Sequence, residues 1–134
     1  MRLEKEIASF QPDVVLALGL AGGRSDKIEI ERVAINCIDA EIPDNAGVQY
    51  RDQVITPDGE NAFFSSLPIA GLLDSLKAAG VPAQISNSAG TYVCNYLFYK
   101  LQELGAASPL RRSGFVHFPF LPEQARGKNP LRLQ

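Results

Sequence analysis

The chain has 134 residues, of which 46% are hydrophobic and 21% charged, and its formal net charge is −2. This balance is typical of one soluble globular domain over residues 1–134, and it indicates binding neither to nucleic acid nor to an acidic membrane surface. No apolar run approaches the roughly 20 residues of a membrane span. Two cysteines and one histidine supply neither a disulfide framework nor a metal site, so we expect a cytoplasmic protein without a metal.

Apolar patterns predict strands and helices that alternate along much of the chain. The expected helices span residues 2–10, 67–80 and 90–105. The expected strands span residues 13–20, 27–36, 82–88 and 114–120.

The order of these elements predicts an α/β fold with a mainly parallel sheet. The first strand reads DVVLALGL, a nearly continuous apolar run that is typical of a buried parallel strand. Residues 48–66 show no regular pattern, so we expect a long surface excursion there. Because the chain begins with a helix and has no closing helix, we expect a shortened version of a larger domain.

Cys94 is a candidate nucleophile because of its place in the chain. It follows a turn of small residues, SNSAGT, and falls in the first turn of the predicted helix 90–105. The positive end of the helix dipole favours an anion such as a thiolate, and the free backbone N–H groups of this turn could bind an oxyanion. The alternative is a buried structural cysteine, which composition alone favours. Cys37 has no such context and is interpreted as structural.

His117 is the only histidine in the sequence, so no other imidazole could act as base for Cys94. A lone histidine on a strand is by default a core residue, but both side chains map to the same edge of the predicted sheet. A carboxylate would orient the ring. The candidates are Glu29, Glu31, Asp39, Glu41 and Asp44. Glu31 stands out because it follows an Ile-rich strand, yet spacing alone does not choose among the five.

Three blocks of sequence closely resemble bacterial pyrrolidone-carboxylate peptidases, also called pyroglutamyl peptidases type I. They read IEIERVAINCIDAEIPDNAG, SNSAGTYVCNYLFY and GFVHFPFLPEQ, and the LGLAGGR turn and the FSSLPI helix entry match as well. The resemblance implies a three-layer α/β sandwich around a mainly parallel twisted sheet, of the phosphorylase/hydrolase-like kind. It also implies a cysteine exopeptidase that removes an N-terminal pyroglutamyl group from peptides.

The resemblance assigns roles to residues of this chain. Cys94 aligns with the nucleophile, His117 with the general base and Glu31 with the acid that completes the triad. The matching positions imply that Ile42, Tyr92 and Val93 line the substrate pocket. The family uses no metal or organic cofactor, and its members form homo-oligomers, often tetramers.

The chain also departs from the family pattern. Leu20 stands where many members have Gln, and Glu41 stands where many have Arg. The family begins earlier, with a strand and a GFxPF-type loop, and it has a final helix after LPEQ, so we expect a chain truncated at both ends. These departures support an alternative function, that of a catalytically inactive binding or remnant protein.

Overall fold

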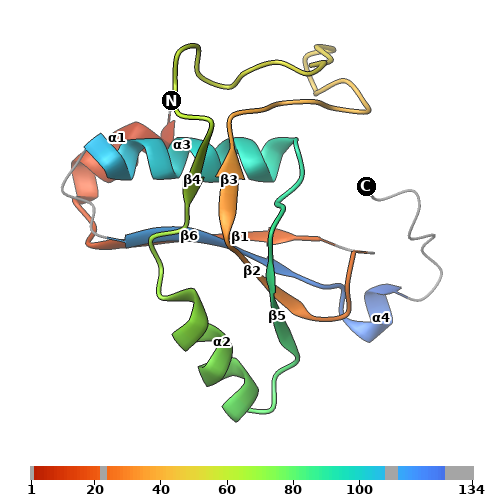
Figure 1. The fold of residues 1–134 in the computed structure, drawn as a ribbon. Helices are drawn as coiled ribbons and strands as arrows, with labels where there is room; N and C mark the ends of the chain where they lie inside the picture. The colour runs from red at the N-terminus through yellow and green to blue at the C-terminus, as the bar shows by residue number, and fades with distance from the viewer. Residues whose placement is uncertain (1, 22–23, 108–111, 126–134) are drawn as a thin grey trace.

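The computed structural model describes residues 2–21, 24–107 and 112–125 (Figure 1). The helices are α1 (Arg2–Phe10), α2 (Ile69–Ala78), α3 (Val93–Ala107) and α4 (Pro122–Ala125). The strands are β1 (Val14–Leu20), β2 (Ile28–Glu31), β3 (Val33–Ile35), β4 (Ala62–Phe64), β5 (Ala83–Ser86) and β6 (Arg112–Phe118). No helix in these ranges is long and apolar enough to cross a bilayer.

The main sheet has the strand order β1-β6-β2-β5. The pairs β1/β6 and β2/β5 are parallel, whereas β2 and β6 are antiparallel. Helix α3 packs against β6 on one face of this sheet, and α2 packs against β5 and β2 on the other (Figure 1). The mainly parallel α/β sandwich is therefore confirmed, with one antiparallel pair at its centre.

The predicted strand 27–36 is wrong as a single element. β2 belongs to the main sheet, whereas β3 pairs with β4 in a separate two-stranded sheet. The switch occurs at Arg32, whose N–H donates to the Ser86 carbonyl while its own carbonyl accepts from the Ser65 N–H. One residue thus bonds to partners on two different segments, and the chain changes sheets there.

The predicted irregular excursion 48–66 contains a strand, β4. The rest of the β3–β4 connection is held at its base by Asn36. Its side-chain oxygen accepts from the N–H groups of Ile55 and Thr56 at 2.8 and 2.9 Å, and its amide donates to the Thr56 carbonyl at 2.9 Å. Ile38 and Gln53 then pair in an antiparallel bridge. These bonds form an arm, residues 38–53, that extends from the sheet.

The core lies between α3 and the main sheet. Phe98 and Tyr99 of α3 and Phe115 of β6 are at most 1% exposed. On the facing side of β1, Ala17 and Gly19 are small, and Phe115 and His117 fill the space next to Gly19. A Cβ at Gly19 would lie 2.8 Å from the Phe115 ring and 3.1 Å from that of His117. This close approach explains glycine at that position.

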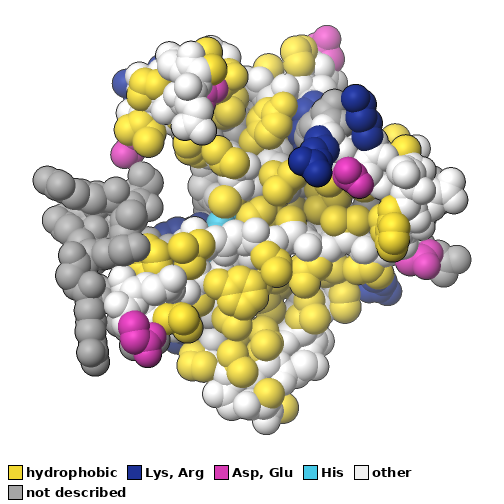
Figure 2. All heavy atoms as spheres, turned by 180° about the vertical axis from the view of Figure 1, so that it is seen from behind, with side chains coloured by type: hydrophobic (Ala, Val, Ile, Leu, Met, Phe, Trp, Pro, Cys, Tyr) yellow, Lys and Arg dark blue, Asp and Glu magenta, His cyan; other side chains and the backbone are white. Residues whose placement is uncertain are grey.

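The other face of β1 is open to solvent, which corrects the prediction of a fully buried strand. Val14, Leu16, Leu18 and Leu20 are each at least half exposed, and they alternate with partly buried residues. β1 is an edge strand of the main sheet. Figure 2 shows hydrophobic side chains gathered over a broad part of the face seen from behind. Exposed apolar side chains that gather in one patch often mark an interaction surface.

Candidate active site

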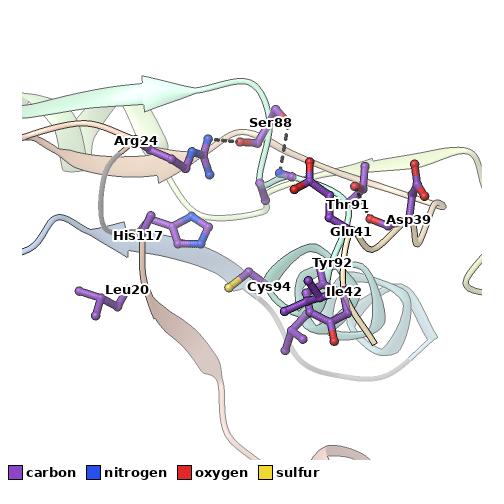
Figure 3. A pocket seen from close by; sticks show the side chains of 14 residues that line it. Leu20, Arg24, Asp39, Glu41, Ile42, Ser88, Thr91, Tyr92, Cys94 and His117 are labelled. Atoms are coloured by element: carbon purple, nitrogen blue, oxygen red, sulfur yellow. Dashed lines mark hydrogen bonds between the residues drawn. The ribbon is translucent and has the colours of Figure 1, made fainter. Parts of the chain in front are cut away.

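A pocket of about 490 Å³ opens where β1 and β6 end and α3 begins (Figure 3). It lies at the carboxyl ends of these parallel strands, where open α/β sheets place their sites. Its lining residues come from four segments of the chain: Leu20, Ala21, Arg24, Asp39, Glu41, Ile42, Ser88, Ala89, Gly90, Thr91, Tyr92, Val93, Cys94 and His117.

Cys94 is the second residue of α3 and a free thiol. The preceding turn is tight: the Gly90 N–H donates to the Ser88 hydroxyl, and Gly90 has a φ of +79°, which favours glycine. Figure 3 shows the Cys94 sulfur directed towards the His117 ring. The thiol therefore lies at the positive end of the helix dipole and beside an imidazole.

His117 is 3% exposed and is held by Glu31. Its Nδ1 lies 2.7 Å from Glu31 Oε1, so an Nδ1–H donates to the carboxylate. The antiparallel pairing of β2 with β6 sets this contact, since His117 is the register partner of Glu29, two residues before Glu31. With Nδ1 engaged, Nε2 is the nitrogen left to interact with Cys94.

The His117 ring carries a proton at neutral pH. Burial lowers its pKa, but interactions with Cys94 and with Glu31 outweigh burial and raise the pKa from 6.5 to about 9. At Cys37, burial and the nearby Asp52 and Asp39 raise the pKa of the thiol.

Among the five candidate carboxylates, Glu31 is the one that contacts His117. It is fully buried, and its second oxygen, Oε2, has no hydrogen-bond partner among the described residues. An unsatisfied buried acceptor is unfavourable by about 1–3 kcal/mol, a cost typical of functional sites. The other four lie elsewhere: Asp39 and Glu41 line the pocket, Glu29 contacts Arg24, and Asp44 accepts from two N–H groups of its own turn.

The predicted substrate contacts all line the pocket. Tyr92 and Val93 lead into α3, and Ile42 comes from the arm 38–53. Thr91 ties the arm to this turn, because its hydroxyl donates to the Asp39 carbonyl at 2.8 Å and its own carbonyl accepts from the Asp39 N–H at 2.7 Å. These bonds join two walls of the pocket, the arm and the turn before α3, which are distant in the sequence.

Sequence reasoning missed two residues that support the site. Arg24 reaches both Glu29 and Glu31 at 3.7 Å and donates to the Ser88 carbonyl. Asn95, 1% exposed, hydrogen-bonds to the backbone of Ile35 and Cys37 and so joins the start of α3 to β3. A polar residue inside an apolar helix was the signal for Asn95.

Comparison with known proteins places these residues in a family. A family model described as pyroglutamyl peptidase matches residues 1–132. The chain belongs to the pyroglutamyl peptidase family. Pyrrolidone-carboxylate peptidase of Fusobacterium nucleatum is 49% identical over 128 residues, which are 95% of this chain and 59% of the relative. Pyrrolidone-carboxylate peptidase 1 of Ralstonia nicotianae is 52% identical over 126 residues, which are 93% of this chain and 58% of the relative.

Solved structures of pyroglutamyl peptidases share the fold. Pyrrolidone carboxyl peptidase from Thermococcus litoralis superimposes with a TM-score of 0.89 at 40% identity, over 95% of this chain and 58% of that one. Pyroglutamyl peptidase I from Bacillus amyloliquefaciens gives 0.88 at 42% identity, over 95% and 62%. The chain thus spans less than two thirds of the length of these pyroglutamyl peptidases.

Proposed function

We propose that this chain is a cysteine exopeptidase that hydrolyses the bond after an N-terminal pyroglutamyl residue of a peptide. Cys94 is the nucleophile, His117 the general acid and base, and Glu31 the residue that orients the ring. One observation carries the proposal: the His117 ring lies in the pocket between the Glu31 carboxylate, at 2.7 Å, and the Cys94 sulfur.

In the proposed mechanism, His117 transfers one proton to the leaving amine and regains one from water. The Cys94 thiolate attacks the pyroglutamyl carbonyl carbon, and free N–H groups at the start of α3 stabilise the oxyanion. The imidazolium then gives its proton to the leaving amine as the carbon–nitrogen bond breaks, which leaves a thioester. Neutral His117 takes a proton from water as the resulting hydroxide attacks the thioester carbonyl carbon. The carbon–sulfur bond then breaks and pyroglutamate leaves, which restores the Cys94 thiolate and the His117 imidazolium.

The pocket suits a neutral ring. A pyroglutamyl lactam carries no charge, so apolar walls with a few polar groups favour its binding. Ile42 and Val93 supply apolar surface, and Tyr92 adds an aromatic ring beside Cys94. We assign these three residues to the lactam. The proposal further includes a cytoplasmic setting, in keeping with two free thiols, and assembly into a homo-oligomer.

The proposal is tested with a chromogenic pyroglutamyl amide. We expect the chain to release the chromophore, and we expect Cys94→Ala to lower kcat/KM by at least about 1,000-fold, the scale on which triad members act. Cys37→Ala is the matched control and should retain activity. Wild-type protein as inactive as Cys94→Ala would contradict the proposal and favour the non-catalytic alternative.

A further inference from the structure

Two carboxylates stand at the pocket and take no part in the proposed chemistry. Asp39 and Glu41 both line it, on the side formed by the arm 38–53 (Figure 3). The Asp39 carboxylate accepts the Asp52 N–H at 3.3 Å. Neither Asp39 nor Glu41 forms an ion pair with a residue that the structure describes, and both are exposed. Their charges therefore act on whatever enters the pocket.

The pocket also contains a cation, but its charge is already balanced. The Arg24 guanidinium lies 3.7 Å from Glu29 and 3.7 Å from Glu31, and both of these carboxylates are buried. Figure 3 places Arg24 beside Ser88, away from Asp39. The Arg24 charge is thus directed to the carboxylates beneath the pocket, and the arm side keeps an excess of negative charge.

A substrate of the proposed activity has one side chain that could carry a positive charge and interact with Asp39 and Glu41. The lactam ring is neutral, and its N-terminal amine is absent because the ring amide has consumed it. The side chain of the residue that follows pyroglutamate is therefore the first group of such a peptide that can carry a charge. A cationic side chain there would be attracted to the carboxylates of Asp39 and Glu41 when screening by salt is modest.

We propose that Glu41, assisted by Asp39, makes the site selective for peptides in which a cationic residue follows the pyroglutamyl group. The inference rests on the proposed peptidase function, and it adds the substrate class. Lysine and arginine at that position are favoured, neutral residues are intermediate, and glutamate or aspartate is disfavoured by like-charge repulsion.

The test compares three amidated tripeptides, pyroglutamyl-lysyl-alanine, pyroglutamyl-glutaminyl-alanine and pyroglutamyl-glutamyl-alanine, by the rate at which pyroglutamate is released. We expect kcat/KM to fall in that order, by about 3- to 10-fold at each step at low ionic strength. The ratio of kcat/KM for the lysyl peptide to that for the glutamyl peptide should shrink in 1 M salt, where the Debye length is only about 3 Å. Glu41→Gln should also reduce this ratio, and Glu41→Lys should reverse the order of the three peptides.

Glu60→Gln is the matched control, because it removes the same charge from an exposed position on the same connection, outside the pocket lining. It should leave the order and spacing of the three rates unchanged. Equal rates for the three peptides, or a preference that Glu41→Gln leaves intact, would overturn the inference while release of pyroglutamate still supports the peptidase function. No release from any tripeptide or from the chromogenic amide would overturn both.

Discussion

At His117, burial and nearby charged groups have opposite effects on the pKa of the ring. The ring is almost inaccessible to water, which disfavours its charged form, yet the adjacent Glu31 and Cys94 raise its pKa to about 9. A protonated ring throughout the neutral range holds the proton that the leaving amine needs. The choice of Glu31 among five carboxylates could not come from spacing, because the antiparallel pairing of β2 with β6 joins segments 86 residues apart.

The His117 titration gives a prediction that needs no activity. As the chain has a single histidine, its ring resonances in an NMR titration report this residue alone. We expect a midpoint near 9 in the wild type and a lower one in Glu31→Gln, by at least about one unit. Asp44→Asn, in a turn of the arm outside the pocket lining, is the control and should leave the midpoint unchanged. A wild-type midpoint near the ordinary 6.5 would show that the ring is not held by charge.

The same pKa sets a pH dependence of stability. Because the folded-state value lies above the unfolded one, the stabilisation is complete below about pH 6.5 and is lost as the pH rises through about 9. The loss should be about 3 kcal/mol in the free energy of unfolding, measured by urea denaturation at several pH values. The dependence should be weaker in Glu31→Gln.

At the scale of elements, the sequence correctly predicted features that depend on neighbouring residues in the chain. The periodic apolar residues and the small residues before Cys94 correctly indicated a helix starting next to the thiol. The division of residues 27–36 between two sheets was not predictable in this way, since it depends on Arg32 bonding to Ser86 and to Ser65. Strand β4 has three residues, too few for an alternating pattern to be recognised.

Asn95 gives the prediction at this scale. Its amide makes three hydrogen bonds, of 2.9 to 3.0 Å, to the backbone of Ile35 and Cys37. Asn95→Ala leaves those buried backbone groups unpaired, so we expect the free energy of unfolding to fall by about 2–4 kcal/mol and activity to fall with it as α3 shifts. Urea denaturation measures the first effect. Asn61→Ala, at an exposed position, should change stability by less than about 0.5 kcal/mol; an equal loss in both variants would contradict the specific role of Asn95.

For the whole molecule, the open face of β1 is an apolar region of the surface that the structure describes. Four branched apolar side chains, Val14, Leu16, Leu18 and Leu20, are at least half exposed on one strand. Strand edges and apolar faces of this kind promote association between chains. The chain also spans only 58–62% of the lengths of the pyroglutamyl peptidases compared above, so the surface that it exposes need not match theirs.

We therefore expect the isolated chain to self-associate through this face. Light scattering after size exclusion should give a mass above 14.5 kDa that increases with concentration. The double variant Leu16→Ser, Leu18→Ser should shift the population towards the monomer, because it removes exposed apolar area without opening a cavity. Val54→Ser, at a similarly exposed apolar residue just after the arm, is the control. A monomeric wild type would contradict the expectation.

Residues on the two faces of β1 should also differ in how well they tolerate mutation. Ala17 and Gly19 face the aromatic rings, and even a methyl group at Gly19 would press on Phe115 and His117. Leu16 and Leu18, their neighbours in sequence, face outwards and touch nothing of the reaction centre. A library that randomises residues 14, 16 and 18 but keeps Leu20, which lines the pocket, should therefore yield a more soluble protein with an unchanged pH–rate profile, whereas Ala17 and Gly19 admit almost no replacement.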